Sequence, residues 1–240
     1  LLPNTLHVLE TIFKKNSEID YFFINSYVVN SSELFSSNSD FDINNKITFD
    51  QNRFSNFKHT KKLTFFELIN PRISFDFLLG MFLSIYRTEL WQKNSSVIDS
   101  KRINDFNLYS NFDNTCPHVK IFATTFKNRL CMFHSTPLSI NLFGEREWND
   151  LYPFIESIRI PQVIELYKDN GMGFIRYFIC KNYALRKLFI NLLKIIFMKK
   201  YTGLKYISIK EDILKNLIFP LIYIAPFFYL FRKIFKIIKN

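Results

Sequence analysis

The densest group of side chains that could carry out chemistry lies at residues 113–118, which read Asp-Asn-Thr-Cys-Pro-His. A carboxylate such as Asp113 can remove a proton as a general base, and an imidazole such as His118 can act as a base or bind a metal. The same residues also suit the start of a helix, with Asp113 or Thr115 near the cap and His118 in the first turn. The local pattern leaves both interpretations open.

A second group of acidic side chains surrounds Trp148. Glu145, Glu147 and Asp150 could be carboxylates that hold an acceptor substrate, and they equally suit the acidic first turn of a helix. The other histidines have no partner at a recognisable spacing. We expect His134, which lies in a strand-like run, to be structural.

The cysteine and glycine contents exclude several kinds of site. Cys116, Cys131 and Cys180 are odd in number and form no CxxC pair, so we expect neither a disulfide framework nor a structural zinc site. Only 5 of the 240 residues are glycine, and no GxGxxG or GxxxxGK[ST] loop for a phosphate is present.

The formal net charge of +11 is concentrated near the C-terminus. Residues 1–113 hold 12 Lys and Arg against 13 Asp and Glu, and residues 114–180 hold 7 against 6. Residues 181–240 hold 13 against 2. A nucleic-acid-binding body would carry basic residues across its fold, so the nearly neutral body argues against a nucleic-acid partner.

The elements that would position these residues alternate between helix and strand. Residues 3–15 are amphipathic, with Leu6, Leu9 and Phe13 on one helical face. Residues 19–29 are rich in β-branched and aromatic side chains, which is typical of a strand buried on both faces in a parallel sheet. A helix followed by a buried strand is half of a βαβ unit, so the sequence predicts an α/β fold.

The rest of the chain is predicted in less detail. We expect a long polar loop at residues 30–62 with short edge strands near 46–49. We expect helices at residues 64–79, interrupted by Pro71, at 87–92, at 117–127 and from 145 onward. We expect strands at residues 80–86, 130–135 and 138–142, the last two on either side of Pro137.

The C-terminal region has the composition of a membrane-surface segment. Residues 174–200 are apolar with Lys and Arg interleaved, and residues 217–231 form a run of 15 apolar residues containing Pro220 and Pro226. A spanning helix needs about 20 such residues. The run ends in cations among Ile and Phe, which is typical of an interfacial helix on anionic lipid. A buried helix pair with snorkelling lysines and a true span are the alternatives.

Three segments, in their order along the chain, resemble the second half of a family 2 glycosyltransferase with a GT-A fold. Residues 1–25, LLPNTLHVLETIFKKNSEIDYFFIN, are similar to the leucine-proline, helix and strand that follow the family's Asp-x-Asp motif. Residues 78–92, LLGMFLSIYRTELWQ, resemble its strand and R-x-x-x-W turn beneath the acceptor site. NTCPHVKIF and STPLSINLF, at 114–122 and 135–143, resemble a helix and strand of the branch that transfers sugars in O-antigen and capsule synthesis.

The resemblance implies transfer of a sugar from a nucleotide-sugar donor to a glycan or polyprenyl-diphosphate-linked acceptor in bacterial surface polysaccharide synthesis. A divalent metal, Mg²⁺ or Mn²⁺, on the Asp-x-Asp motif would neutralise the diphosphate leaving group. The resemblance begins just after that motif, so we expect the metal ligands mostly outside this chain and the chain to be a fragment lacking most of the donor site. Asp113 as base and His118 as an acceptor-side or metal-linked residue lie near the place of the family's catalytic base.

We therefore expect three parts: an acceptor-side part of a GT-A domain at residues 1–150, a helical region at 151–212, and a membrane-associating tail at 213–240. The expected location is peripheral, on the cytoplasmic face of the bacterial inner membrane, where the acceptor lipid lies. The alternative is a non-catalytic, membrane-peripheral assembly or scaffold protein.

Overall fold

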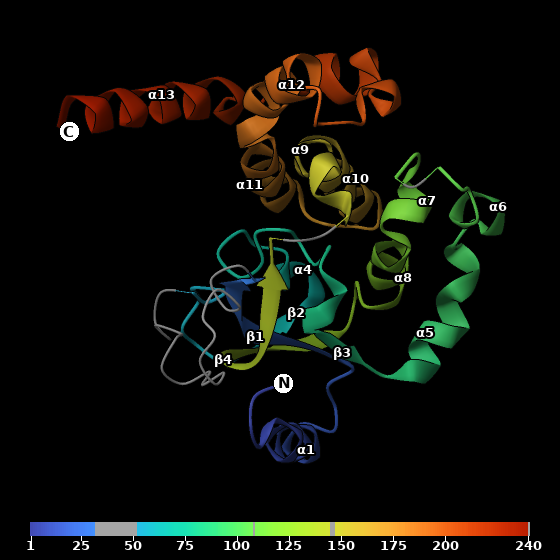
Figure 1. The fold of residues 1–240 in the computed structure, drawn as a ribbon. Helices are drawn as coiled ribbons and strands as arrows, with labels where there is room; N and C mark the ends of the chain where they lie inside the picture. The colour runs from blue at the N-terminus through green and yellow to red at the C-terminus, as the bar shows by residue number, and fades with distance from the viewer. Residues whose placement is uncertain (32–51, 108, 145–146, 240) are drawn as a thin grey trace. The chain divides into compact units, whose positions relative to one another are not determined.

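The computed structural model describes residues 1–31, 52–107, 109–144 and 147–239. These residues form a four-stranded sheet of mixed direction together with helices and short 3₁₀ and π turns, so the predicted α/β class is confirmed (Figure 1). The predicted loop at 30–62, with its edge strands near 46–49, lies largely outside the described residues.

The chain folds into two compact units, each built from two stretches of sequence. The first contains Leu1–Ser95 and Ile121–Asn149, and the second contains Ser96–Lys120 and Asp150–Asn240. The expected division kept residues 1–150 together and set 213–240 apart. The structure instead groups residues 96–120 with everything after 149, so Asp113 and His118 belong to the second unit.

The sheet of the first unit is built around β1 (Tyr21–Asn30), whose residues are almost all buried. The strand order is β2-β4-β1-β3. β1 pairs in parallel with β4 (Leu130–Phe143) and antiparallel with β3 (Ser84–Tyr86), and β2 (Lys61–Thr64) pairs antiparallel with β4. The predicted buried strand is confirmed, because a continuous apolar run is what burial on both faces requires.

The two strands predicted around Pro137 form one strand, β4. Proline has no N–H for the ladder, and the register shifts here. Between the pair Ile24–His134 and the pair Ser26–Ser139, β1 advances two residues and β4 advances five. The Asn25 amide bridges the irregular stretch, because its Nδ2 donates to the carbonyl oxygens of Ser55 and Ser135 at 2.9 and 3.0 Å. A buried amide thus replaces the missing ladder bonds.

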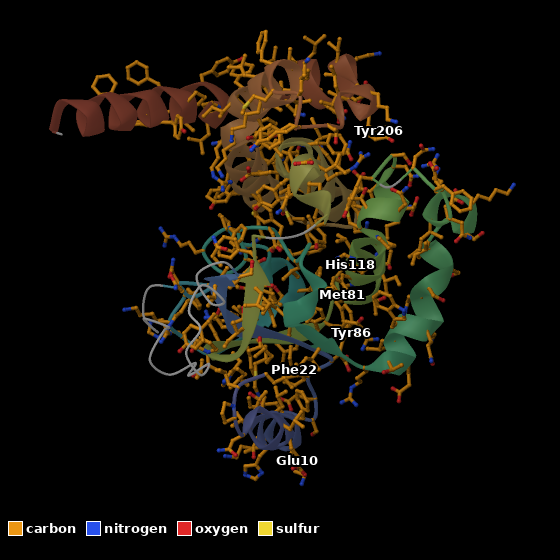
Figure 2. The ribbon with its side chains drawn as sticks, in the orientation of Figure 1. Glu10, Phe22, Met81, Tyr86, His118 and Tyr206 are labelled. Atoms are coloured by element: carbon orange, nitrogen blue, oxygen red, sulfur yellow. The ribbon has the colours of Figure 1, made fainter. Side chains whose placement is uncertain are left out.

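Helix α1 (Thr5–Lys15) packs on one face of the sheet. The predicted apolar face is confirmed for Leu9 and Phe13, whereas Leu6 is 71% exposed. Leu9 and Ile12 join a core cluster with Phe22 of β1, which points toward α1 (Figure 2). The Tyr21 ring belongs to a separate aromatic cluster, with ring centroids 5.0 to 5.7 Å away. These rings come from α4 (Phe65–Leu68), from α8 (Pro117–Thr125) and from Phe126. The predicted helices at 87–92 and 117–127 are observed as α5 (Thr88–Asn94) and α8.

The helix predicted over residues 64–79 is wrong beyond its first turn, and the strand predicted at 80–86 is limited to β3. Phe77 and Leu78 adopt positive φ angles of 54° and 67°. The half-buried Asp76 holds this turn, since its carboxylate accepts hydrogen bonds from Ser74 Oγ at 2.6 Å and Gly80 N at 2.8 Å. Such local bonds compete with helix formation.

The second unit is helical. Its α-helices are α6 (Ser100–Ile103), α7 (Phe112–Thr115), the first half of α8, α9 (Tyr152–Phe154), α10 (Ile160–Asp169), α11 (Phe174–Ala184), α12 (Leu188–Phe197) and α13 (Leu221–Lys239). Two π-helical turns, Ile155–Arg159 and Ile209–Ile213, accompany them. The first π turn is buried throughout and connects α9 to α10.

The C-terminal run does not behave as a separate tail. α13 continues through Pro226, and Phe219 and Ile222 are buried in the second unit. Among the described helices, none alone has the length and apolar character to cross a membrane. Ile209–Asn216 and Leu221–Tyr229 meet those requirements only as a pair, with a bend of 81° between them.

Candidate functional site

Asp113 lies in the single-turn helix α7 and is 1% exposed. Asn111 caps this helix, because its side chain accepts a bond from the Asn114 backbone N–H at 3.1 Å and the Asn114 side chain returns one at 3.3 Å. The Asp113 carboxylate lies 2.5 Å from Lys120 Nζ. Asp113 therefore forms an ion pair with Lys120 that joins α7 to α8.

His118 is the second residue of α8 and is half-buried (Figure 2). Pro117 begins this helix, where its missing N–H costs nothing. The helix-start interpretation is confirmed for His118, which lies in the first turn of α8. Asp113 and Thr115, expected near the cap of that helix, lie instead within the preceding helix α7, which Asn111 caps. The catalytic roles of Asp113 and His118 stay predictions.

The described residues contain no cluster of three or more His, Cys, Asp or Glu that could hold a metal. The three cysteines are free and buried, and burial raises the pKa of each thiol, that of Cys180 to about 12. These thiols are therefore neutral and poorly suited to nucleophilic attack. An Asp-x-Asp sequence occurs within this chain at Asp40–Asp42, which falls outside the described residues. The expectation that the metal ligands lie mostly outside this chain stays a prediction.

The acidic group around Trp148 is only partly visible. Glu145 lies outside the described residues, as do the side chains of Glu147 and Trp148. Asp150 is held through its backbone, since its carbonyl accepts a bond from the Thr202 N–H at 3.1 Å. The acceptor role of these carboxylates stays a prediction.

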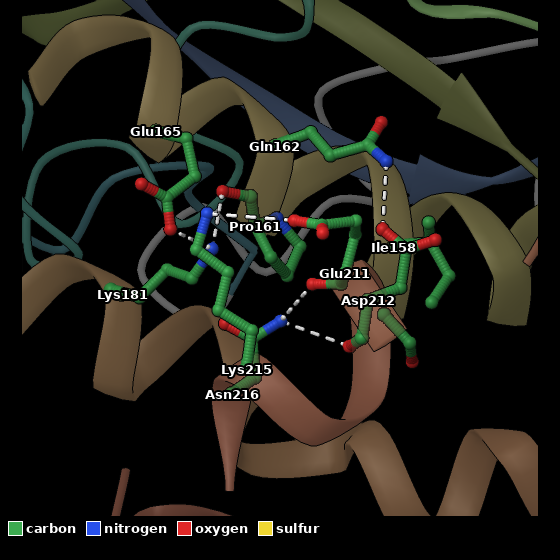
Figure 3. Close-up of a pocket in the computed structure, with 10 residues that line it drawn as sticks. Ile158, Pro161, Gln162, Glu165, Lys181, Glu211, Asp212, Lys215 and Asn216 are labelled. Carbon is green, nitrogen blue, oxygen red and sulfur yellow. Dashed lines mark hydrogen bonds and ion pairs between the residues drawn. The ribbon is translucent and has the colours of Figure 1, made fainter. Parts of the chain in front are cut away.

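A polar cavity of about 170 Å³ lies inside the second unit (Figure 3). Both π-helical turns contribute to its wall, together with α10, α11 and the segment before α13. Single-turn π-helical insertions are frequent at functional sites. The lining residues are Ser157, Ile158, Pro161, Gln162, Glu165, Lys181, Glu211, Asp212, Lys215 and Asn216.

The most buried charge at this cavity belongs to Lys181, which is 2% exposed. Its Nζ donates to Glu165 Oε1 at 2.8 Å and to the Pro161 carbonyl at 3.0 Å. Burial lowers the pKa of Lys181 below its usual value, although Glu165 opposes the shift. Burial alone would raise the pKa of Glu165, but the hydrogen bonds from Lys181 and Tyr177 outweigh it and lower that pKa.

The opposite wall of the cavity is held by amide side chains. Gln162 Nε2 donates to Asp212 Oδ1 at 2.9 Å, and Gln162 Oε1 accepts from Arg159 at 2.7 Å. Asn216 Nδ2 donates to the Asp212 carbonyl at 2.9 Å, whereas its buried Oδ1 has no protein partner within the described residues.

The cavity suits binding better than acid-base chemistry. Glu165 and Lys181 lie 2.8 Å apart and pair with each other, so each already has a fixed partner in place of a ligand with which to exchange a proton. An apolar cavity of about 150 Å³ holds a benzene molecule, so this one has room for several waters or one small ring. Its polar wall favours water.

In the first unit, His134 of β4 has both ring nitrogens inaccessible and without a hydrogen-bond partner among the described residues. Burial lowers its pKa. A neutral imidazole in this setting is part of the sheet core, in line with the structural role expected for it.

Comparison with protein-family models, curated proteins and solved structures found no match to this chain. The class of protein is therefore defined by what the fold and side chains themselves display. That class is an α/β protein with a mixed four-stranded sheet in one unit and a helical unit with a polar cavity.

The sequence analysis missed this cavity. A signal was present: Tyr177, Cys180, Lys181 and Ala184 follow helical spacing, which places Lys181 on the buried face of α11. A lysine on an otherwise apolar helix face calls for a buried counterion. Glu165 at the matching position of α10 could not be identified without knowing how the two helices pack.

Proposed function

We propose that this chain is the acceptor-side portion of a GT-A glycosyltransferase of family 2. It would transfer a sugar from a nucleotide-sugar donor to a glycan or lipid-linked acceptor in bacterial surface polysaccharide synthesis. One observation carries the proposal: three segments that resemble the family lie side by side in one sheet. β1, which begins in the first segment, pairs with β3 of the second segment (Tyr21 with Tyr86) and with the part of β4 that lies in the third (Ser26 with Ser139).

The R-x-x-x-W turn supports the proposal by its position at the edge of this sheet. Arg87 Nε lies 2.8 Å from the Asp20 carboxylate, which immediately precedes β1 and also pairs with Arg129. The Trp91 ring stacks on Tyr86, with centroids 5.3 Å apart. The ion pair thus connects the second segment to the first, and the ring contact holds the turn against β3 within the second segment.

In this proposal the donor and its divalent metal are bound mostly by residues outside this chain. Asp113 acts as the base and His118 contacts the acceptor or a metal-linked group. A base role requires the pair of Asp113 with Lys120 to open toward an acceptor hydroxyl. The C-terminal residues 213–240 hold the protein at the cytoplasmic face of the membrane, where a polyprenyl-diphosphate acceptor lies.

The second candidate is a non-catalytic, membrane-peripheral assembly or scaffold protein. The state of Asp113 favours it, because a buried carboxylate paired to an ammonium is what a purely structural residue would show. This candidate shares the membrane attachment but requires neither donor nor metal.

The test uses the full-length protein that contains this chain, with transfer and donor binding measured separately. Asp113→Asn should abolish transfer and leave donor binding intact. Lys120→Met is the matched control, because it breaks the same ion pair and keeps the carboxylate. Loss of transfer in Asp113→Asn alone supports the base role. Equal loss in both variants, or full activity in both, removes Asp113 from that role, and no transfer from any nucleotide-sugar in the wild type favours the scaffold.

A further inference from the structure

Helix α11 is apolar on two opposite faces. Tyr177, Cys180, Lys181 and Ala184 form the face that is buried in the second unit. The opposite face consists of Phe174, Ile175, Phe178 and Ile179, which are 72%, 77%, 37% and 54% exposed. These four side chains, which we call the outer face of α11, follow the i, i+1, i+4, i+5 spacing of one helix side.

The outer face of α11 continues into the segment before α13. The rings of Phe174 and Phe178 lie 6.4 Å apart, and Phe178 lies 5.4 Å from the buried Phe219. Ile218, next to Phe219, is 75% exposed. The Leu221 N–H donates to Asn182 Oδ1 at 2.8 Å, which ties the start of α13 to α11. The exposed side chains on both elements therefore form one continuous apolar region.

The charge of the surrounding chain selects the kind of partner. Residues 181–240 hold 13 Lys and Arg against 2 Asp and Glu. A contiguous apolar region of this kind marks an interaction site in a soluble protein. Apolar side chains in a stretch of chain with an excess of cations match an anionic bilayer, where the apolar groups enter the acyl boundary and the cations meet the headgroups.

We propose that the outer face of α11 inserts into the headgroup region of an anionic bilayer, as a lipid contact in addition to residues 213–240. This extends the membrane attachment stated above and rests on it. It is independent of glycosyl transfer. α11 and α13 would then lie on the same lipid surface, which holds the second unit by two helices instead of one.

The test measures binding of the full chain to vesicles of phosphatidylcholine and phosphatidylglycerol in equal parts by co-flotation. Ile175→Asp should lower the partition coefficient about tenfold or more, because it removes an aliphatic side chain that inserts into lipid and places an anion against the anionic headgroups. Phe227→Asp tests the α13 contact in the same way. Phe106→Asp is the matched control, since Phe106 is fully exposed and lies outside the outer face.

A second measurement reports insertion directly. In Ile175→Trp, brominated lipid should quench the added fluorescence, whereas the same substitution at Phe106 should give no added quenching. Unchanged binding of Ile175→Asp together with loss in Phe227→Asp would overturn the contact by α11 and leave attachment by α13 in place.

Unchanged binding in both Asp variants would refute both contacts, whatever the transfer assay shows. A change in oligomeric state of Ile175→Asp by light scattering, without a change in vesicle binding, would assign the outer face to a second copy of the chain and overturn the proposal.

Discussion

The buried pair of Lys181 with Glu165 predicts an unequal response to removal of its two partners. The Lys181 side chain is 2% exposed, whereas that of Glu165 is 25% exposed. Removing Glu165 leaves a buried ammonium with one protein acceptor, the Pro161 carbonyl. Removing Lys181 leaves a carboxylate that reaches solvent and still accepts a bond from Tyr177 at 2.8 Å.

The magnitudes follow from these environments. Removing one partner of a buried pair costs about 3–5 kcal/mol when the remaining charge is uncompensated. Glu165→Gln keeps an amide oxygen near Lys181, so we expect about 3 kcal/mol. Lys181→Met removes the buried ammonium and leaves the Glu165 carboxylate, which reaches solvent and still accepts a hydrogen bond from Tyr177, so the remaining charge is largely compensated. With Glu165 partly solvated, we expect about 1 kcal/mol or less.

Urea unfolding at neutral pH measures both variants and the double variant, which should resemble Lys181→Met. The cost of Glu165→Gln should also shrink as the pH rises. The folded-state pKa of Lys181 is lowered by burial, so the unfolded state binds more protons and stability increases with pH up to the unfolded value near 10.4. A cost of Lys181→Met equal to or above that of Glu165→Gln would refute this reasoning.

Three further predictions concern other positions. Because the pKa of His134 is lowered in the folded state, the folded state loses stability as the pH falls below about 6.5. His134→Phe should raise the free energy of unfolding by about 1 kcal/mol, since both ring nitrogens lack a partner among the described residues. The substitution should also flatten this pH dependence, as measured by urea midpoints at acidic and neutral pH. Gly203→Ala should cost about 3 kcal/mol, because φ is +104° and the new Cβ would lie 2.7 Å from Phe154. Gly173→Ala is the control and should be neutral, because nothing lies within 4 Å of its new Cβ, and thermal unfolding measures both variants. Asp20→Asn should cost about 1 kcal/mol, reduced by salt, since it removes the partner of two half-exposed arginines.

The sequence predicted those elements whose stability comes from their own pattern. α1 and α8 have apolar spacing and suitable first residues, and β1 is a continuous apolar run, so each was identified close to its observed bounds. β4 shows where such reasoning ends. Pro137 suggested two strands, but the Asn25 side chain, distant in sequence, supplies the bonds that allow one strand to continue.

The candidate site was predicted less well for the same reason. Asp113 looked available for catalysis because the sequence displays its type and spacing, while its burial and its pairing with Lys120 depend on how α7 packs against α8. The cavity combines residues from positions 157 to 216. The local pattern marks only Lys181, on the buried face of α11, because each of the other polar members alone is an ordinary residue and their grouping depends on how the helices pack.

The second unit places a charge inside and apolar side chains outside on the same helix. In α11, Lys181 faces the core and Ile175 faces outward. In water this arrangement is unfavourable in two ways, since burying the ammonium costs several kcal/mol of desolvation and exposing Ile175 forgoes its burial. Glu165 and Pro161 offset the first cost from within the unit. The second has no compensation inside the described fold, and contact with a lipid surface would supply it. The Lys181–Glu165 pair and the outer face of α11 are therefore separable properties. Binding to vesicles should change the surroundings of the outer face of α11 and leave the Lys181–Glu165 pair as it is.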